Sequence, residues 1–212
     1  MDILIATANP HKIEELQILF AEVLAETAPT LRFLSLVMAQ ERYHTPTIPD
    51  VEETGATFEE NAYIKAQAYF SLWGIPVISD DSGLEVDVLG GRPGVYSARY
   101  GGESTSFAEK RKLIAQEVSP FPLPHTARFR CVMCYHDGLR TYFAEGSVEG
   151  EIVPERGAGG FGYDAQFQPL GTQYTFGEMP THQKHHLSHR GHASRALAEQ
   201  LRALWVETDT QE

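Results

Sequence analysis

The chain opens with a short apolar run and continues into a helical repeat of apolar positions. Residues Asp2–Thr7 form the apolar run and predict a β-strand. Asn9 and Pro10 follow, and the pair is typical of a helix start, because an Asn side chain caps the first turn and a proline there loses no hydrogen bond. Helical spacing then joins Ile13, Leu16, Leu19, Phe20 and Val23. A strand, a tight turn and a helix in this order open many nucleotide-binding α/β folds.

Two further helices are predicted in the middle of the chain, each starting at a capping box. Thr57 with Glu60 starts a helix that runs to about Leu72, and Ser106 with Glu109 starts one that runs to about Val118. One side of the first of these helices carries Phe58, Ala62, Lys65, Ala66 and Tyr69. Short apolar or alternating segments predict strands at 31–36, 75–79 and 84–89, whereas the polar, proline-containing residues 39–56 predict a loop.

The last third of the chain predicts a hairpin and a long helix. Residues 127–135 and 139–148 are strand-like and flank Asp137-Gly138, a turn pair, and residues 150–153 extend the same sheet. The final helix is predicted from Ser188 to about Val206. Parallel βα units mixed with a hairpin indicate the α/β class, as a single domain over residues 1–212 with a long mixed β-sheet and a second lobe.

Composition narrows the class of protein and its partners. Of the 212 residues, 42% are hydrophobic and 22% are charged, which is typical of an ordinary globular protein. The formal net charge of −12 argues against a nucleic-acid polymer as partner, because such partners demand a basic face. A small anion remains compatible with an acidic chain, since a few cations and backbone N–H groups can gather at one site.

The sequence also argues against a membrane-spanning or secreted protein. No apolar run approaches the roughly 20 residues that span a bilayer. The N-terminus has neither a basic segment nor a cleavage site, so we expect a cytoplasmic protein without membrane attachment. Cys131 and Cys134 are spaced C-x-x-C, but they lie on a predicted strand, where residues three apart face opposite sides. We therefore interpret them as buried thiols in a reducing compartment.

The turn after the first strand is a candidate phosphate site. Its backbone N–H groups stand at a helix N-terminus and Lys12 adds a positive charge, both of which favour an anion. The spacing of a P-loop is absent, and a plain Asn-Pro helix cap with a surface lysine explains the same residues.

Two pairs of adjacent acids are candidate ligands for magnesium. Glu52 and Glu53 lie in the predicted loop, and Asp80 and Asp81 follow a buried strand at the end where open α/β sheets place ligands. Mg²⁺ takes one or two carboxylates together with waters and phosphates, and Asp81 could act as a general base. A solvated loop and a turn after a strand are the alternatives, but two acids at a buried strand end are unfavourable without a cation.

Two later segments carry glycine, aromatic and cationic residues. The Gly-rich loop 157–164 contains Phe161 and Tyr163, either of which could stack on a base or fill an irregular loop. Residues 184–192 are rich in cations, and their histidines, with His182, allow a zinc interpretation. Ser188 is typical of a helix cap, however, so these histidines are not expected to share one helix.

Taken together and in order, these motifs resemble the inosine-triphosphate pyrophosphatase family, the XTP/dITP diphosphatases. The matching text covers roughly residues 3–204: Ala6-Thr7-Ala8-Asn9 with Lys12, Glu53-Thr54-Gly55 followed by Phe58-Glu59-Glu60-Asn61-Ala62, Asp80-Asp81-Ser82-Gly83-Leu84, 93–100, 159–164 and Ser188-His189-Arg190. The resemblance implies an elongated two-lobed fold with the active site in the cleft between the lobes, and a homodimer.

The resemblance also implies a reaction and its residues. The family hydrolyses deaminated purine nucleoside triphosphates to a monophosphate and pyrophosphate with Mg²⁺. The metal ion would be bound by Glu52, Glu53 and Asp81, and Asp81 would also be the catalytic proton acceptor. Substrate would be bound by Thr7, Ala8, Asn9, Pro10, His11, Lys12, Ser82, Phe161, Gly162, Tyr163, Asp164, Lys184, His189 and Arg190.

Three departures from the family pattern concern details of substrate binding. Ala8 stands where the family usually has glycine, Ala165-Gln166 follows Asp164 where proline is common, and Thr181-His182-Gln183 precedes Lys184 where acids are frequent. Because the departures leave the residues of the reaction in place, the resemblance implies an enzyme that removes ITP, dITP and XTP and so cleanses the nucleotide pool. The alternatives are a diphosphatase for another modified nucleotide and a non-catalytic nucleotide-sensing module.

Overall fold

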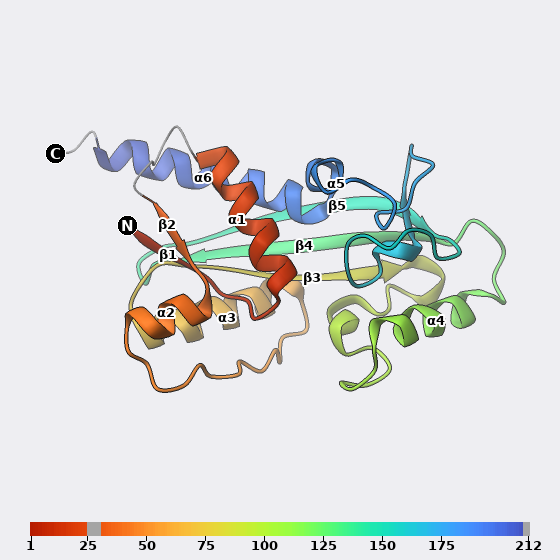
Figure 1. Cartoon of the computed structure of the whole chain (residues 1–212), viewed down its shortest axis with the longest axis horizontal. Helices are drawn as coiled ribbons and strands as arrows, with labels where there is room; N and C mark the ends of the chain where they lie inside the picture. Colours follow the sequence, from red (N-terminus) through yellow and green to blue (C-terminus); the bar gives the residue numbers. More distant parts are fainter. Residues whose placement is uncertain (25–30, 210–212) are drawn as a thin grey trace. The chain divides into compact units, whose positions relative to one another are not determined.

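The computed structural model describes residues 1–24 and 31–209, and Figure 1 follows them in colour along the chain. The elements are β1 (Asp2–Ile5), α1 (Pro10–Leu24), β2 (Arg32–Leu34), α2 (Leu36–Arg42), α3 (Phe58–Trp73), β3 (Val77–Val86), η1 (Asp87–Leu89), η2 (Gly94–Arg99), α4 (Phe107–Val118), β4 (Thr126–His136), β5 (Thr141–Ile152), η3 (Asp164–Gln166), β6 (Phe167–Pro169), α5 (Thr181–Leu187) and α6 (His189–Asp209). This confirms the α/β class. Within the described ranges no helix has the length and apolarity to cross a bilayer.

The strands form one mixed sheet, as the sequence predicted. Its six strands are ordered β2-β1-β3-β4-β5-β6, with β1 parallel to both β2 and β3 and β5 antiparallel to β6. The turn between β4 and β5 has a local cause, because Asp137 Oδ1 accepts hydrogen bonds from the backbone N–H groups of Leu139 and Arg140 at 2.9 and 2.7 Å. The predicted hairpin is therefore present, and β5 includes the expected extension 150–153 as far as Ile152.

Strand β3 differs from the prediction. The sequence predicted two strands, at 75–79 and 84–89, but one strand runs from Val77 to Val86. Asp80 and Asp81 therefore lie inside a strand rather than at its end. The prediction was wrong because it treated two adjacent charges as a strand terminus. Ion pairs with Lys12 and Lys65 compensate both carboxylates, so the buried extended backbone continues past them.

The predicted loop 39–56 was also partly wrong, because α2 occupies its beginning. Ser35 caps this helix by accepting a hydrogen bond from the N–H of Met38, and Leu36 and Ala39 are its buried residues. With only two buried positions the helix has little periodicity to detect. Both predicted capping boxes are confirmed, at Thr57 with Glu60 and at Ser106 with Glu109. The side chain of Val23 lies outside the described part of the structure.

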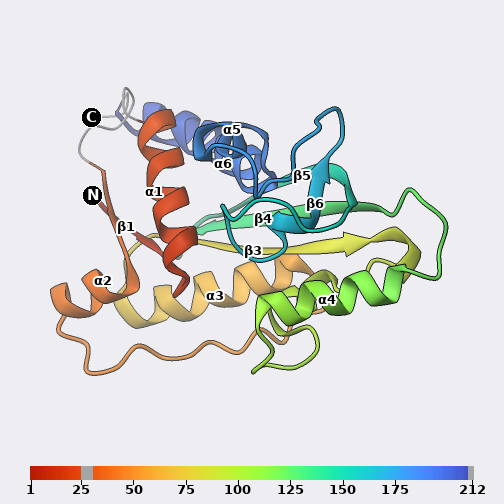
Figure 2. The same cartoon turned by 45° about the vertical axis from the view of Figure 1, so that its right-hand side comes forward.

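The chain divides into two compact units, each described by itself. The first contains residues 1–81, 132–145 and 191–212, and its last described residue is 209. In both Figure 1 and Figure 2, α2 and α3 lie on one face of its strands and α1 and α6 on the other. The face toward α2 and α3 is apolar, with Leu4, Leu34, Val77, Ala62, Ala66 and Tyr69 in one cluster. Ile3 and Ile5, fully buried, alternate with Leu4 and so point to the opposite face.

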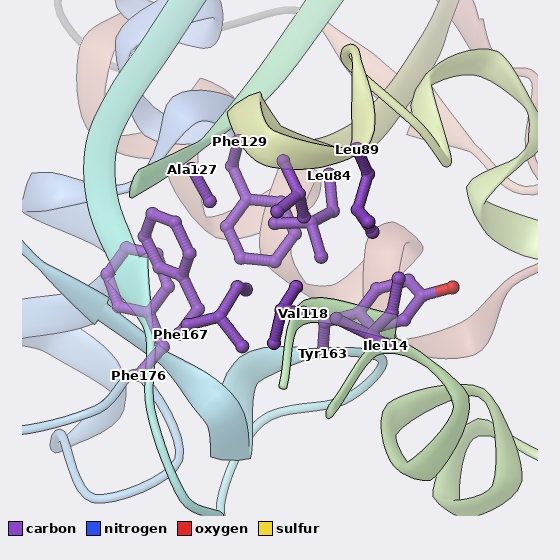
Figure 3. Packing of buried hydrophobic residues seen from close by; sticks show 11 residues of the cluster. Leu84, Leu89, Ile114, Val118, Ala127, Phe129, Tyr163, Phe167 and Phe176 are labelled. Carbon is purple, nitrogen blue, oxygen red and sulfur yellow. The ribbon is translucent and has the colours of Figure 1, made fainter. Parts of the chain in front are cut away.

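The second unit contains residues 82–131 and 146–190 and has its own aromatic core. Figure 3 shows this cluster, in which Ile114 and Val118 of α4 gather with Leu84, Leu89, Ala127, Phe129, Tyr163, Phe167 and Phe176. The ring of Phe129 lies 4.6 Å from that of Phe167, and Phe167 lies 5.5 Å from Phe176, centroid to centroid. These aromatic contacts anchor the irregular segment 153–180, which contains little regular secondary structure.

Candidate active site

The turn between β1 and α1 is built by its own side chains. Asn9 Oδ1 accepts from the N–H of His11 at 3.0 Å, and Thr7 Oγ1 accepts from the N–H of Asn9 at 3.2 Å. Ala8, Pro10 and His11 are exposed. The Asn-Pro cap predicted from the sequence is therefore present, and it presents the N-terminus of a 15-residue helix, where backbone N–H groups favour an anion.

Lys12 leaves this turn and pairs with the acids of β3. Its Nζ donates to Asp80 Oδ2 at 2.9 Å, and the side chain of Asp80 has a relative exposure of 0%. A buried carboxylate is unfavourable unless it is paired, so Lys12 compensates Asp80. In return the position of the lysine ammonium group is held by the strand. Asp80 thus functions first as a counter-ion for Lys12.

Asp81 lies in a second set of contacts. Asn61 Nδ2 donates to Asp81 Oδ2 at 3.0 Å, and Lys65 Nζ lies 3.9 Å from Asp81 Oδ1. The same ammonium group donates to Glu53 Oε1 at 2.5 Å. Glu53 is therefore brought beside Asp81 by a shared lysine, whereas Glu52 is exposed. We refer to Lys12, Glu53, Lys65, Asp80 and Asp81 as the acidic cluster.

Protonation in the acidic cluster is perturbed in a direction that suits proton transfer. Burial raises the pKa of Asp81 above its ordinary value, and the Glu53 carboxylate adds to this, while Lys65, Lys12 and the Asn61 amide oppose it. Burial by itself would lower the pKa of Lys65, but the carboxylates of Asp81, Glu53 and Asp80 outweigh it and raise that pKa. Lys65 is thus a permanent cation, and Asp81 has an increased affinity for a proton.

The acidic cluster also fits a magnesium ion that is shared with a substrate. Among the described residues, no group of three or more His, Cys, Asp or Glu is placed to hold a metal ion by itself. Magnesium needs no such cage, because it binds one or two carboxylates and completes its shell with waters and phosphates. Glu53 and Asp81 supply two hard oxygen donors that contact the same ammonium group. The donor set therefore fits Mg²⁺ bound together with a phosphate ligand.

The second unit contains a different polar cluster, built around an aromatic ring. Lys184 Nζ lies 4.7 Å and Arg190 Cζ 5.6 Å from the centroid of the Phe161 ring, within cation–π range. Asp164 Oδ2 accepts from the N–H of Phe161 at 2.7 Å and from Lys184 Nζ at 2.9 Å. Ser82 Oγ accepts from Arg190 Nη2 at 2.9 Å. We refer to Ser82, Phe161, Asp164, Lys184 and Arg190 as the Phe161 cluster.

The glycines of this loop allow the carboxylate of Asp164 to approach the backbone. A Cβ atom on Gly160 would lie 2.2 Å from Asp164 Oδ2, and its φ of +68° also favours glycine. The carbonyl of Gly162 accepts from Arg111 Nη1 at 2.7 Å, and Arg111 Nε donates to Glu155 Oε2 at 2.9 Å. The loop that carries Phe161 is therefore held at one side by Asp164 and at the other by α4.

Tyr163 and His189 belong to the core of the second unit. Tyr163 is 3% exposed, its hydroxyl donates to the carbonyl of Ser97 at 2.9 Å, and its ring packs edge-to-face on Phe107 at 5.6 Å. The His189 ring stacks on Phe129 with a centroid distance of 4.7 Å and an interplanar angle of 10°. Of the two aromatics considered for stacking on a base, the structure places only Phe161 among cationic side chains. The histidines near Ser188 are divided between α5 and α6, as predicted.

Sequence reasoning missed Lys65, Asn61 and Arg111. A signal existed for Lys65, because it occupies the otherwise apolar face of the predicted helix 57–72, and a cation on such a face needs a buried partner. Asn61 lies in the motif 58–62, but nothing in its spacing indicates what it contacts. Arg111 gave no signal, because a charged residue on an amphipathic helix is usually solvated.

Comparisons with known proteins agree with the motifs. The Ham1 family model matches residues 3–200. A dITP/XTP pyrophosphatase from Thioalkalivibrio sulfidiphilus is 42% identical over 206 residues, which are 95% of this chain and 98% of that relative. One from Methylococcus capsulatus is 43% identical over 207 residues, covering 95% and 96%. The Ham1 protein of Staphylococcus aureus has a solved structure with a TM-score of 0.81 and 34% identity, covering 96% of this chain and 99% of its own. A HAM1 protein from Coxiella burnetii also gives 0.81, with 33% identity over 98% and 99%.

Proposed function

This chain belongs to the Ham1 family, and from that premise we propose that it hydrolyses the deaminated purine nucleotides ITP, dITP and XTP to a nucleoside monophosphate and pyrophosphate with Mg²⁺. The observation that carries the proposal is the acidic cluster, in which a buried carboxyl of raised pKa, Asp81, lies with two ammonium groups and two further acids. The relatives named dITP/XTP pyrophosphatases support the choice of substrate.

The phosphates are bound by the turn from Thr7 to Lys12. Its backbone N–H groups and the Lys12 ammonium supply positive potential, and Lys65 adds a second fixed cation. Mg²⁺ held by Glu53 and Asp81 would neutralise phosphate charge and lower the pKa of a bound water. The residues of the chain thereby compensate the negative charge that develops on the leaving pyrophosphate.

Asp81 accepts the proton from the attacking water. The water oxygen forms a bond to the α-phosphorus, the bond from that phosphorus to the α–β bridging oxygen breaks, and the electron pair leaves with pyrophosphate. A carboxyl with a raised pKa is a better base at neutral pH than an ordinary aspartate. Lys65 stays protonated and orients Asp81 and Glu53 through its ion pairs.

The base is recognised by residues of the Phe161 cluster. The Phe161 ring offers an apolar surface for a purine, and the Arg190 guanidinium offers only donors, which suit the six-carbonyl of hypoxanthine and xanthine. The six-amino group of adenine would leave such a buried donor unpaired, which is unfavourable. Tyr163 and His189, which adjoin Asp164 and Arg190 in the chain, are fixed in the core by Ser97 and Phe129, and Gly162 and Asp164 shape the loop.

A panel of nucleotides tests the proposal. ITP, dITP, XTP, GTP and ATP are incubated with Mg²⁺, and pyrophosphate and orthophosphate are measured separately. Pyrophosphate from ITP and XTP well above that from ATP is the expected result. Orthophosphate as the initial product would make the protein a phosphatase. Turnover of a different modified nucleotide in preference to all five, or tight binding without turnover, would favour the alternative diphosphatase or the sensing module.

The biological role and assembly belong to the same proposal. Removal of deaminated purine triphosphates in the cytoplasm would keep hypoxanthine and xanthine out of DNA and RNA. We expect a homodimer without bound nucleic acid, and light scattering of the purified protein measures its mass against the 23.6 kDa of one chain.

A further inference from the structure

Asn61, at the start of α3, has no role in the reaction proposed above, yet it is fully buried, with a relative exposure of 0%. Its Oδ1 accepts from the backbone N–H of Gly55 at 2.8 Å, and its Nδ2 donates to Asp81 Oδ2 at 3.0 Å. The orientation of this amide is determined by its surroundings. A backbone N–H can only donate, so it must face the amide oxygen, and the amide nitrogen then faces the carboxylate.

The contact with Gly55 explains why the acidic loop contains a glycine. A Cβ atom on Gly55 would lie 2.7 Å from Asn61 Oδ1 and 2.6 Å from the Cβ of Glu60. Any other residue would push the loop away from α3. Glu53 lies two residues before this point of attachment. The position of Glu53 is therefore linked through the Asn61 side chain to Asp81.

The contact with Asp81 distinguishes the two carboxylate oxygens. Oδ2 accepts from Asn61, whereas Oδ1 is the oxygen on the side of Lys65, at 3.9 Å. An amide donor on Oδ2 restricts rotation of the carboxylate and disfavours a proton on that oxygen. A carboxylate held in one orientation presents the same oxygen to a water in every turnover.

We propose that Asn61 is a positioning residue for the hydrolysis, which orients Asp81 so that Oδ1 receives the proton of the water and holds the Glu53 loop in place. The inference rests on the proposed function and deepens it. Its distinctive content is that one side chain has two separable roles, one for each end of its amide.

Two substitutions separate these roles. Asn61→Ala removes both contacts, and Asn61→Asp keeps an acceptor for Gly55 but places an oxygen where Asp81 needs a donor. Both should lower kcat for ITP by about 10²-fold, with KM changed by less than about threefold, since misplacing a catalytic group has effects of this size. Amide hydrogen exchange at Gly55 should be protected in Asn61→Asp and fast in Asn61→Ala. Wild-type kcat in Asn61→Asp would overturn the assignment to Asp81.

A matched control loosens the same turn without touching Asp81. Thr57 Oγ1 accepts from the N–H of Glu60 as the cap of α3, so Thr57→Ala weakens this helix start alone. Its kcat should stay within about twofold of the wild type. A loss as large as that of Asn61→Ala would assign the effect to the helix start and overturn the proposal.

A stability measurement covers the case in which Asn61→Asp folds poorly. In the double variant Asn61→Asp/Asp81→Asn a donor again faces an acceptor, so its urea midpoint should recover toward that of Asp81→Asn alone. No recovery would show that the Asn61–Asp81 contact is absent. This stability cycle requires no turnover. If the wild-type protein hydrolyses none of the nucleotides, the proposed function is refuted, and the cycle still tests whether Asn61 and Asp81 are in contact.

Discussion

The acidic cluster and the Phe161 cluster differ in the sign of the net charge carried by the residues that define them. The first has three carboxylates, Glu53, Asp80 and Asp81, against two ammonium groups. The second has two cations, Lys184 and Arg190, against the single carboxylate of Asp164, all placed around an aromatic ring. An excess of negative charge suits a divalent cation with its phosphates, and an excess of donors beside a ring suits a purine carbonyl. Under the proposed function, the acidic cluster would carry out the chemistry and the Phe161 cluster would recognise the base.

The largest expected effect concerns Asp81, on which the chemical role of the acidic cluster depends. Asp81→Asn keeps the size of the side chain but removes the base and one metal charge, so kcat for ITP should fall by about 10²-fold or more. Initial rates at saturating Mg²⁺ measure the effect. Asp87→Asn, a matched change of an exposed acid that pairs with Arg128, should leave kcat unchanged. Near-wild-type turnover in Asp81→Asn would remove the chemical role from the acidic cluster.

Recognition by the Phe161 cluster should show as selectivity rather than as rate alone. Arg190→Met keeps volume but removes the guanidinium, so kcat/KM for ITP should fall about tenfold more than kcat/KM for ATP. Arg128→Met, which removes a partly exposed guanidinium from the same unit, is the control and should leave the ratio unchanged. An equal loss for both nucleotides would mean that Arg190 positions phosphate or stabilises the fold.

The burial of Asp81 in the acidic cluster should also make the stability of the protein depend on pH. Burial raises the folded-state pKa of Asp81 above the unfolded value of about 4, so stability is lost as pH rises from that value through the raised pKa. Asp81→Asn cannot ionise, and its stability relative to the wild type should therefore increase across this window. Urea unfolding between about pH 4 and pH 7 measures the difference. Parallel curves for the two proteins would contradict the raised pKa.

The smallest expected effect comes from Tyr163, the aromatic that lies in the core. Tyr163→Phe removes a buried hydrogen bond to the Ser97 carbonyl and should lower the free energy of unfolding by about 1 kcal/mol. It should leave the KM for ITP unchanged, whereas Phe161→Leu should raise it. Urea unfolding and initial rates provide the two readouts. A raised KM in Tyr163→Phe would place this side chain, rather than Phe161, against the substrate.

Local patterns predicted most of the elements and many of the candidate residues. Some features depend only on neighbouring residues and can be predicted without the rest of the chain. They include the capping boxes at Thr57 and Ser106 and the Asp137-Gly138 turn. The same locality explains the failures. Helix α2 depends on two buried residues, and the continuation of β3 through Asp80 and Asp81 depends on Lys12 and Lys65, which are distant in sequence.

The sequence alone determined which chemical groups are present and in which order, because the motifs and their spacing lie along the chain. Tertiary structure decided which of those groups meet. It brought Lys65 between Glu53 and Asp81, left Glu52 in solvent and placed Tyr163 in the core. The physical reason is that compensation of a buried charge depends on distance in space, and contacts such as Asn61 with Asp81 join residues that no local periodicity connects.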